Sequence, residues 1–187
     1  ECAMQLHAML TEAGRPIEDI ARITLRTQEA CLRIIDKKGP LNNPADRDHC
    51  VQYMIAVPLI FGRLTADDYE DHVAADPRID ALRAKITCVE DPGFTADYHD
   101  PEKRSIANAI TVELNDGTVL PEVVCEYPLG HRRRRSEGLP LLEAKFRRNL
   151  ARHFSEAQQR AILDASADTH RLMSQPVRDY VALYVPQ

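Results

Sequence analysis

The sequence contains no tryptophan, and aromatic residues of all kinds make up only 5% of its 187 residues. Cysteine is sparse too: the chain has five, and no two of them form a CxxC pair. An odd number of scattered thiols argues against both a zinc site and a disulfide framework. Such thiols are typical of a reduced compartment, so we expect a cytoplasmic protein without a structural metal.

Long apolar runs are also missing. No stretch approaches the roughly 20 apolar residues that a membrane-spanning helix requires, and no secretory signal peptide is visible. The chain has no P-loop, GxGxxG, HExxH or GxSxG motif. We therefore expect no membrane association, no nucleotide, no metal and no other cofactor.

The charge balance opposes a general role in nucleic-acid binding, because the net charge is -5 and the pI is about 5.8. One basic run, His131 to Arg135, stands out against this acidic mean. The chain begins without methionine and within a helical pattern. We therefore expect it to be part of a longer protein.

The apolar periodicity predicts an α+β fold in which clustered strands are set apart from helices. The expected elements are helix 2–14, strand 20–27, helix 28–36, a helix from about 46 to 61, helices near 65 and at 77–84, strands 86–90, 110–114 and 119–127, and helices after 139 and 155. Asp46 is expected to cap the helix that ends near Phe61, and Pro58 to kink or interrupt it. We expect a two-layer sandwich in which helices cover a mainly antiparallel four-stranded sheet.

Residues 43–53 carry the most suggestive chemistry. On a helix, His49 and Tyr53 are four residues apart and share a face, with Gln52 beside them. An imidazole and a phenol that face one cavity can transfer protons and bind carboxylates. The same pattern also fits an ordinary helix start with a half-buried His and Tyr.

Two basic segments are candidate anion sites. Guanidinium groups match carboxylates in a bidentate geometry, so the run 131–135 suits a substrate with several carboxylates. The charged segment 98–105 offers His99, Lys103 and Arg104 as further contacts. Both segments also fit a solvated surface or a polar connector.

Three long strings resemble the MmgE/PrpD family, and the likeness extends from about residue 1 to about residue 165. They are PLNNPADRDHCVQYMIAVPLIFGRLTADDYED, then ADPRIDALRAK with DPGFTADYHDPEKRSIANAI, and finally EYPLGHRRRRSEGLPLLEAKFRRNLA. The resemblance implies a metal-independent hydro-lyase that converts 2-methylcitrate to 2-methyl-cis-aconitate in propionate breakdown. Citrate is a possible second substrate, and a homodimer is expected.

The same resemblance implies a division into parts. Residues 1–16 would end a large helical domain that is missing here, 17–138 would form an α/β lid, and 139–187 would return to the helical domain. The family's HSFQY-like string matches at His49, Gln52 and Tyr53 but departs at Cys50 and Val51. We therefore predict that Tyr53 and His49 act in catalysis.

We predict substrate contacts from six further side chains. These are Arg47, Gln52, Arg104, His131, Arg132 and Arg133. The resemblance places the main catalytic residues outside this chain, so we expect the chain to be inactive alone. Two alternatives stay open: a non-catalytic dimerisation or interaction domain, and a related cis-aconitate decarboxylase or epimerase.

Overall fold

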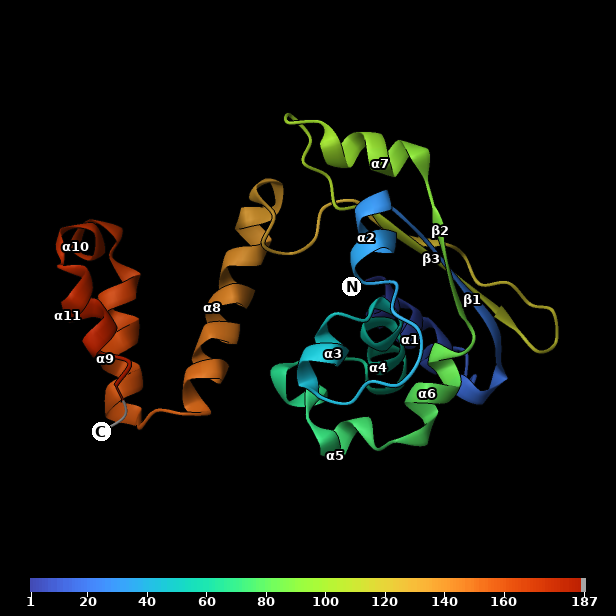
Figure 1. Cartoon of the computed structure of the whole chain (residues 1–187), viewed down its shortest axis with the longest axis horizontal. Helices are drawn as coiled ribbons and strands as arrows, with labels where there is room; N and C mark the ends of the chain where they lie inside the picture. Colours follow the sequence, from blue (N-terminus) through green and yellow to red (C-terminus); the bar gives the residue numbers. More distant parts are fainter. Residues whose placement is uncertain (186–187) are drawn as a thin grey trace. The chain divides into compact units, whose positions relative to one another are not determined.

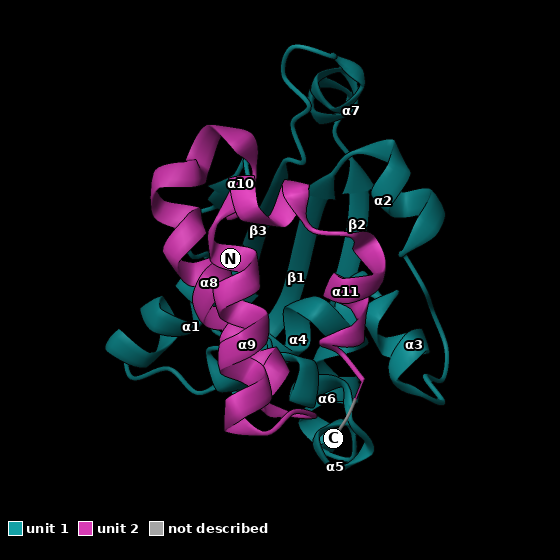
Figure 2. Cartoon of the chain, turned by 90° about the vertical axis from the view of Figure 1, so that its left-hand side faces the viewer, with its two compact units in different colours: residues 1–128 teal, residues 129–187 magenta. Residues whose placement is uncertain are grey.

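The computed structural model describes residues 1–185 and divides the chain into two compact units, Glu1–Pro128 and Leu129–Gln187, which are coloured separately in Figure 2. The helices and strands are labelled in Figure 1. Unit 1 contains α1 (Cys2–Glu12), η1 (Ile17–Asp19), β1 (Ile20–Thr27), α2 (Glu29–Ile34), α3 (Pro44–Asp48), α4 (Val51–Phe61), η2 (Ala66–Tyr69), α5 (Asp71–Ala74), α6 (Pro77–Arg83), β2 (Ile86–Glu90), α7 (Pro92–His99), β3 (Asn108–Leu114) and β4 (Val123–Cys125). Unit 2 contains η3 (Arg132–Arg134), α8 (Arg135–Ala151), α9 (Glu156–Ala167), α10 (Thr169–Ser174) and α11 (Val177–Ala182).

Unit 1 is built on a four-stranded sheet with the order β2-β1-β3-β4. The β1–β2 pair is parallel, whereas β1–β3 and β3–β4 are antiparallel. The predicted α+β class and the mainly antiparallel sheet are therefore confirmed. The predicted domain boundaries at 16/17 and 138/139 stay a prediction, as does the assignment of the terminal helices to a further domain.

Strand β1 shows how the sequence produces a sheet with one wet face. Ile23 and Leu25 are buried on one face, and Arg22 and Arg26 lie on the other, as period-2 alternation requires. A register shift between Ile20 and Arg22 puts Ile20 back on the buried face. On the wet face, Arg22 pairs with Glu113 of β3 at 2.5 Å.

Helix α1 contacts β3, β4 and helix α4, and both helices share one apolar core with the buried face of the sheet. Helix α1 buries Ala3, Leu6 and Leu10, which recur at helical spacing. Helix α4 is apolar all round, and nine of its eleven residues are buried. It continues through Pro58, so the predicted interruption is absent, and a kink at Pro58 stays a prediction.

Two segments of unit 1 differ from expectation. No element was predicted between the strands at 86–90 and 110–114, but residues 92–99 form α7, which begins where the Asp91 carboxylate accepts hydrogen bonds from Gly93 N and Phe94 N. The return strand of the hairpin was expected at 119–127, but β4 covers only Val123–Cys125, with an isolated bridge at Val119.

Every regular element among the described residues of unit 2 is a helix. Helix α8 begins at Arg135, four residues before the expected start at 139, and Ser155 caps α9 as expected for a helix start at that position. Leu150 and Ile162 are buried between these helices. The Gln158 side chain donates to the carbonyls of Leu183 and Val185, which fastens the last described residues to α9. No helix among the described residues is long and apolar enough to cross a bilayer.

Candidate functional site

The segment that carries the predicted catalytic pair forms two helices rather than one. Asn43 caps α3 by accepting from Asp46 N at 2.9 Å, so the expected cap at Asp46 is wrong. Helix α3 ends at Asp48 with His49 as its C-cap, and Cys50 is extended. Val51 N bonds to the Ile35 carbonyl at 2.9 Å, and this tertiary contact coincides with the break between α3 and α4.

His49 and Tyr53 therefore do not share a helix face, and that prediction is wrong. The His49 side chain is 65% exposed, and its Nδ1 lies 2.5 Å from Asp48 Oδ1. The hydrogen bond and charge of Asp48 raise the pKa of His49 above its ordinary value, which favours the protonated imidazole. His49 is thus an accessible side chain at the turn between α3 and α4, and Asp48 raises its pKa.

Tyr53 lies in the opposite environment. It is 2% exposed, its hydroxyl donates to the Asp68 carbonyl at 2.6 Å, and its ring stacks on Tyr69 at 5.9 Å between centroids. Burial raises the pKa of Tyr53. Its hydroxyl already holds η2 in place, so an active role for this group stays a prediction.

Arg47 is also buried within the fold. Its two terminal nitrogens donate to the Tyr69 carbonyl and to Asp71 Oδ1, both at 2.6 Å, which ties α3 to η2 and α5. Arg47 and Tyr53 line a cavity of about 200 Å³ together with Arg83 and Asp80. Because Asp71 is largely exposed, it is the partner of Arg47 that an incoming carboxylate could most easily replace.

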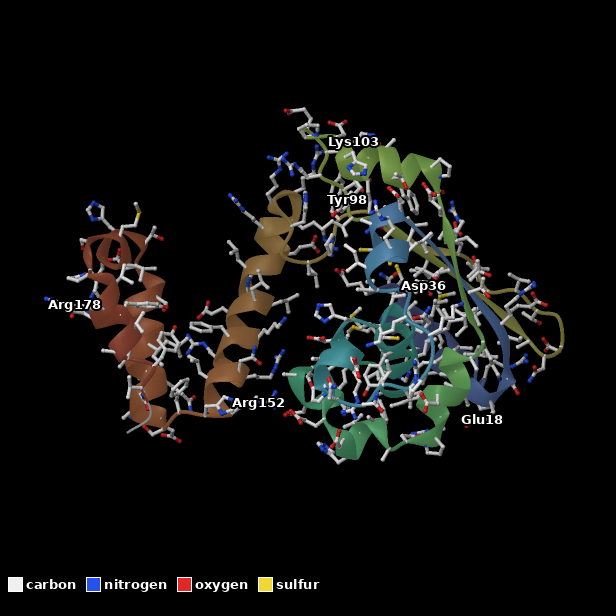
Figure 3. The ribbon with its side chains drawn as sticks, viewed as in Figure 1. Glu18, Asp36, Tyr98, Lys103, Arg152 and Arg178 are labelled. Carbon is white, nitrogen blue, oxygen red and sulfur yellow. The ribbon has the colours of Figure 1, made fainter. Side chains whose placement is uncertain are left out.

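Gln52 is buried at the neighbouring cavity. Its amide donates to Asp36 Oδ1, and its carbonyl accepts from Cys50 Sγ at 3.3 Å. Figure 3 labels Asp36, which follows α2 and so connects this amide to the loop before α3. Burial and the nearby Asp36 raise the pKa of Cys88, which also contacts the Gln52 amide, to about 12.

The cavity beside Gln52 has a volume of about 330 Å³ and gathers three cationic side chains, Lys37, Lys38 and Arg83, with one carboxylate, Asp80, which pairs with Arg83. We call these three residues with Gln52 the basic pocket. Lys37 pairs with Asp46, and Lys38 is exposed. His49 does not line this cavity. An arrangement of this kind can hold carboxylate groups.

Sequence reasoning missed Lys37, Lys38 and Arg83. The adjacent lysines before Gly39 were a usable signal, because two cations in a loop that precedes the candidate segment suit an anion. Arg83 gave no such signal, since it lies at the end of α6 and reaches the pocket only through the packing of α6 on α4.

The remaining predicted contacts lie elsewhere. Arg104 follows α7, is exposed, and has a left-handed backbone with φ of 49°. Helix α7 lies at the opposite end of unit 1 from α5 in both Figure 1 and Figure 2. His131, Arg132 and Arg133 belong to unit 2, where His131 Nδ1 accepts from Arg133 N at 3.2 Å.

A third cavity, of about 420 Å³, is lined mainly by apolar side chains from α1, α2, α4 and the sheet. It contains none of the predicted site residues. Within residues 1–185, no three His, Cys, Asp or Glu side chains gather as metal ligands would.

Comparison with known proteins decides the family. The model of the MmgE/PrpD C-terminal domain matches residues 1–170. The chain belongs to the MmgE/PrpD family. Among curated members, the 2-methylcitrate dehydratase of Cupriavidus necator is 71% identical over 98% of this chain. The Escherichia coli K12 protein of the same name is 64% identical over 99%, and the mitochondrial one of Yarrowia lipolytica is 57% identical over 99%.

The match covers only part of these family members. The chain spans 38% of the length of the Cupriavidus necator and Escherichia coli proteins and 35% of the Yarrowia lipolytica protein. Because the matching family model describes a C-terminal domain, this chain corresponds to the C-terminal portion of longer relatives.

Proposed function

We propose that this chain is the C-terminal part of a 2-methylcitrate dehydratase, a hydro-lyase that removes water from 2-methylcitrate to give 2-methyl-cis-aconitate. The observation that carries the proposal is 71% identity to a protein of that name over 98% of the chain. Citrate is the second substrate to be tested, because it presents the same three carboxylates. The proposed reaction belongs to propionate breakdown by the methylcitrate route.

Dehydration makes separate demands on the protein. A base must take a proton from the carbon next to the one that bears the hydroxyl, and an acid must protonate the departing hydroxyl so that it leaves as water. Cationic groups must hold the three carboxylates while this happens. In our proposal this chain forms a lid that holds the substrate, and residues outside the chain carry out most of the proton transfer.

The basic pocket supports that role. Lys37, Lys38 and Arg83 present positive charge around a cavity large enough for a carboxylate-bearing arm. His49 adds an exposed imidazole whose raised pKa favours the protonated form. The protonated ring is the form that can act as an acid or donate a hydrogen bond to a substrate carboxylate. We propose His49 as the lid residue closest to the chemistry and Tyr53 as the residue that positions η2.

The other predicted contacts would act in different ways. Gln52 would hold the loop at Asp36 in place beside the basic pocket, and Arg47 would contact substrate only by releasing Asp71. Arg104 would contribute from the loop after α7. A further set would act from unit 2: His131, Arg132 and Arg133.

Closure of a lid over the substrate excludes water and strengthens each charge–charge contact, because the effective dielectric falls. The chain alone would then bind weakly and would not turn over substrate. Homodimer formation and a cytoplasmic location complete the proposal.

A segment exchange tests the function. The matching segment of the Cupriavidus necator enzyme is replaced by these 187 residues, and dehydration of 2-methylcitrate and citrate is followed by ultraviolet absorbance of the conjugated product. We expect the exchanged protein to keep at least a tenth of the parent kcat, and the 187-residue chain alone to show no turnover. A folded exchanged protein that dehydrates neither acid would contradict the proposal.

Three variants of the exchanged protein then test the site. Lys38→Gln and His49→Gln should each lower kcat/KM by about tenfold to a hundredfold, the effect of losing one charge-assisted contact. Lys145→Gln, which removes an exposed lysine of α8, is the matched control and should change kcat/KM less than twofold. The two alternatives have their own readouts. If the exchanged protein is supplied with cis-aconitate, analysis of the products distinguishes a cis-aconitate decarboxylase from a dehydratase. Binding without turnover in every assay would favour a non-catalytic interaction domain.

A further inference from the structure

The 420 Å³ cavity of unit 1 has no role in the proposed reaction. Its lining is mostly aliphatic and comes from α1, α2, α4 and the sheet, with Gln28 and Asn108 among the few polar groups. The measured space is far more than the ~10–15 Å³ that one water molecule needs. Waters inside would find few partners on such walls, so the cavity favours an apolar occupant.

The rim of this cavity is apolar, and no other part of unit 1 covers it. Ile34 is 69% exposed and Ile106 is 42% exposed, and both line the opening. Tyr98 of α7, which is labelled in Figure 3, lines the same cavity. Large apolar side chains around a hollow mark a surface where another protein segment, a partner or a ligand binds.

The thiols in the cavity indicate the same polarity. Cys2 and Cys31 line it, and burial raises the pKa of Cys2 to about 11 and also raises that of Cys31. A neutral thiol behaves as a small apolar group. These two side chains therefore fit an apolar occupant better than a charged substrate.

The first turn of α1 identifies the occupant. Glu1, Cys2 and Ala3 all line the cavity, so any residues joined to Glu1 emerge at its opening. Helix α1 buries Cys2, Ala3, Leu6 and Leu10 along one stripe. The Glu1 side chain makes no capping hydrogen bond to the helix N-terminus, so no cap opposes a further turn.

We propose that, in the full-length protein, the residues that immediately precede Glu1 continue α1 by one or two turns and close this cavity with an apolar side chain. Helical periodicity puts the residues three and four positions before Cys2 on the stripe that faces the cavity. The relatives supply the chain that this requires, because the match spans only 38% of their length and falls in a C-terminal domain. The proposal rests on this family relationship and not on the reaction.

Photo-crosslinking identifies the occupant directly. Ile34 is replaced by benzoylphenylalanine in the exchanged full-length protein described above, the protein is irradiated, and crosslinked peptides are found by mass spectrometry. We expect crosslinks to the ten residues before Glu1 of the same polypeptide. Crosslinks to another part of the chain, crosslinks between copies, or no protein crosslink at all would overturn the proposal.

A pair of charge substitutions gives an independent readout. Ile34→Asp and Val119→Asp each place a carboxylate at an apolar side chain that is exposed in this chain, by 69% and 57%. If the cavity is covered, Ile34→Asp should lower the thermal midpoint of the full-length protein by about 3–6 °C. Val119→Asp, on the distant hairpin, should shift it by about 1 °C or less. Equal shifts for the two variants would overturn the proposal.

Neither experiment requires activity. An inactive exchanged protein that still crosslinks through position 34 would contradict the proposed function and leave the closed cavity standing. An active protein without the crosslink would do the reverse.

Discussion

Replacing Tyr53 by Phe separates a structural role from a catalytic one at the residue that sequence reasoning favoured most. The substitution removes one oxygen atom and leaves the ring in place. In the structure that oxygen donates to the Asp68 carbonyl at 2.6 Å, in a side chain that is 2% exposed. The ring should keep its stacking on Tyr69, so no large cavity forms.

The expected cost follows from this geometry. A buried hydrogen bond whose loss leaves its partner unsatisfied costs about 1–3 kcal/mol, more than its net contribution when both partners are removed. The carbonyl of Asp68 is that partner, and η2 can shift slightly toward water, which reduces the penalty. We therefore expect Tyr53→Phe to lower the free energy of unfolding by about 1–2 kcal/mol.

Urea denaturation of the 187-residue chain, followed by far-ultraviolet circular dichroism, measures this change. With a slope of about 1–3 kcal/mol per molar urea, the midpoint should fall by roughly 0.3–2 M. Tyr69→Phe is the matched control, because the Tyr69 hydroxyl makes no hydrogen bond within the described residues. It should change the unfolding free energy by less than about 0.5 kcal/mol.

Activity of the exchanged full-length protein completes the comparison. If the Tyr53 hydroxyl only positions η2, kcat should fall less than tenfold when the assay is run well below the unfolding midpoint. A hundredfold loss of kcat with an unchanged urea midpoint would refute the structural reasoning and support a catalytic phenol.

Two further predictions concern the turn at His49 and the end of α4. Asp48→Asn should lower the His49 pKa toward its ordinary value of about 6.5, measured by the pH dependence of the imidazole NMR shifts, because the carboxylate that favours the cationic ring is gone; an unchanged titration would contradict this. Gly62→Ala should destabilise the chain by more than Gly14→Ala, since both glycines have φ near +65° but only at Gly62 would the new Cβ meet His7, at 2.8 Å. We expect about 1–2 kcal/mol for Gly14→Ala and a larger loss at Gly62, measured by urea denaturation, and equal losses would exclude the His7 clash.

The strands were predictable because their information is local. In β1, apolar Ile23 and Leu25 alternate with Arg22 and Arg26 within a few consecutive residues. This alternation alone predicts which face of the strand is buried. Strands β1 and β2 begin and end at the predicted residues. Helix α7 was missed because it has no apolar stripe; its start depends on the Asp91 cap and its place on its contacts with α2.

The candidate site was less predictable, and the reason is visible at His49. Spacing alone placed His49 and Tyr53 on one helix face. The chain breaks at Cys50, where Val51 bonds to the Ile35 carbonyl, a contact between residues sixteen positions apart in sequence. One broken turn rotates the imidazole into solvent and leaves the phenol in the core.

The sequence by itself determined the family, the α+β class and the faces of the central strands. Long matching strings and apolar alternation are local features, so they do not depend on how the helices and strands pack together. Only the tertiary structure decided which charged groups meet. Arg83 reaches Lys37 and Lys38 through the packing of α6 on α4, and Arg47 is held by η2 and α5. Side-chain proximity of this kind depends on distances between elements, which no local pattern encodes.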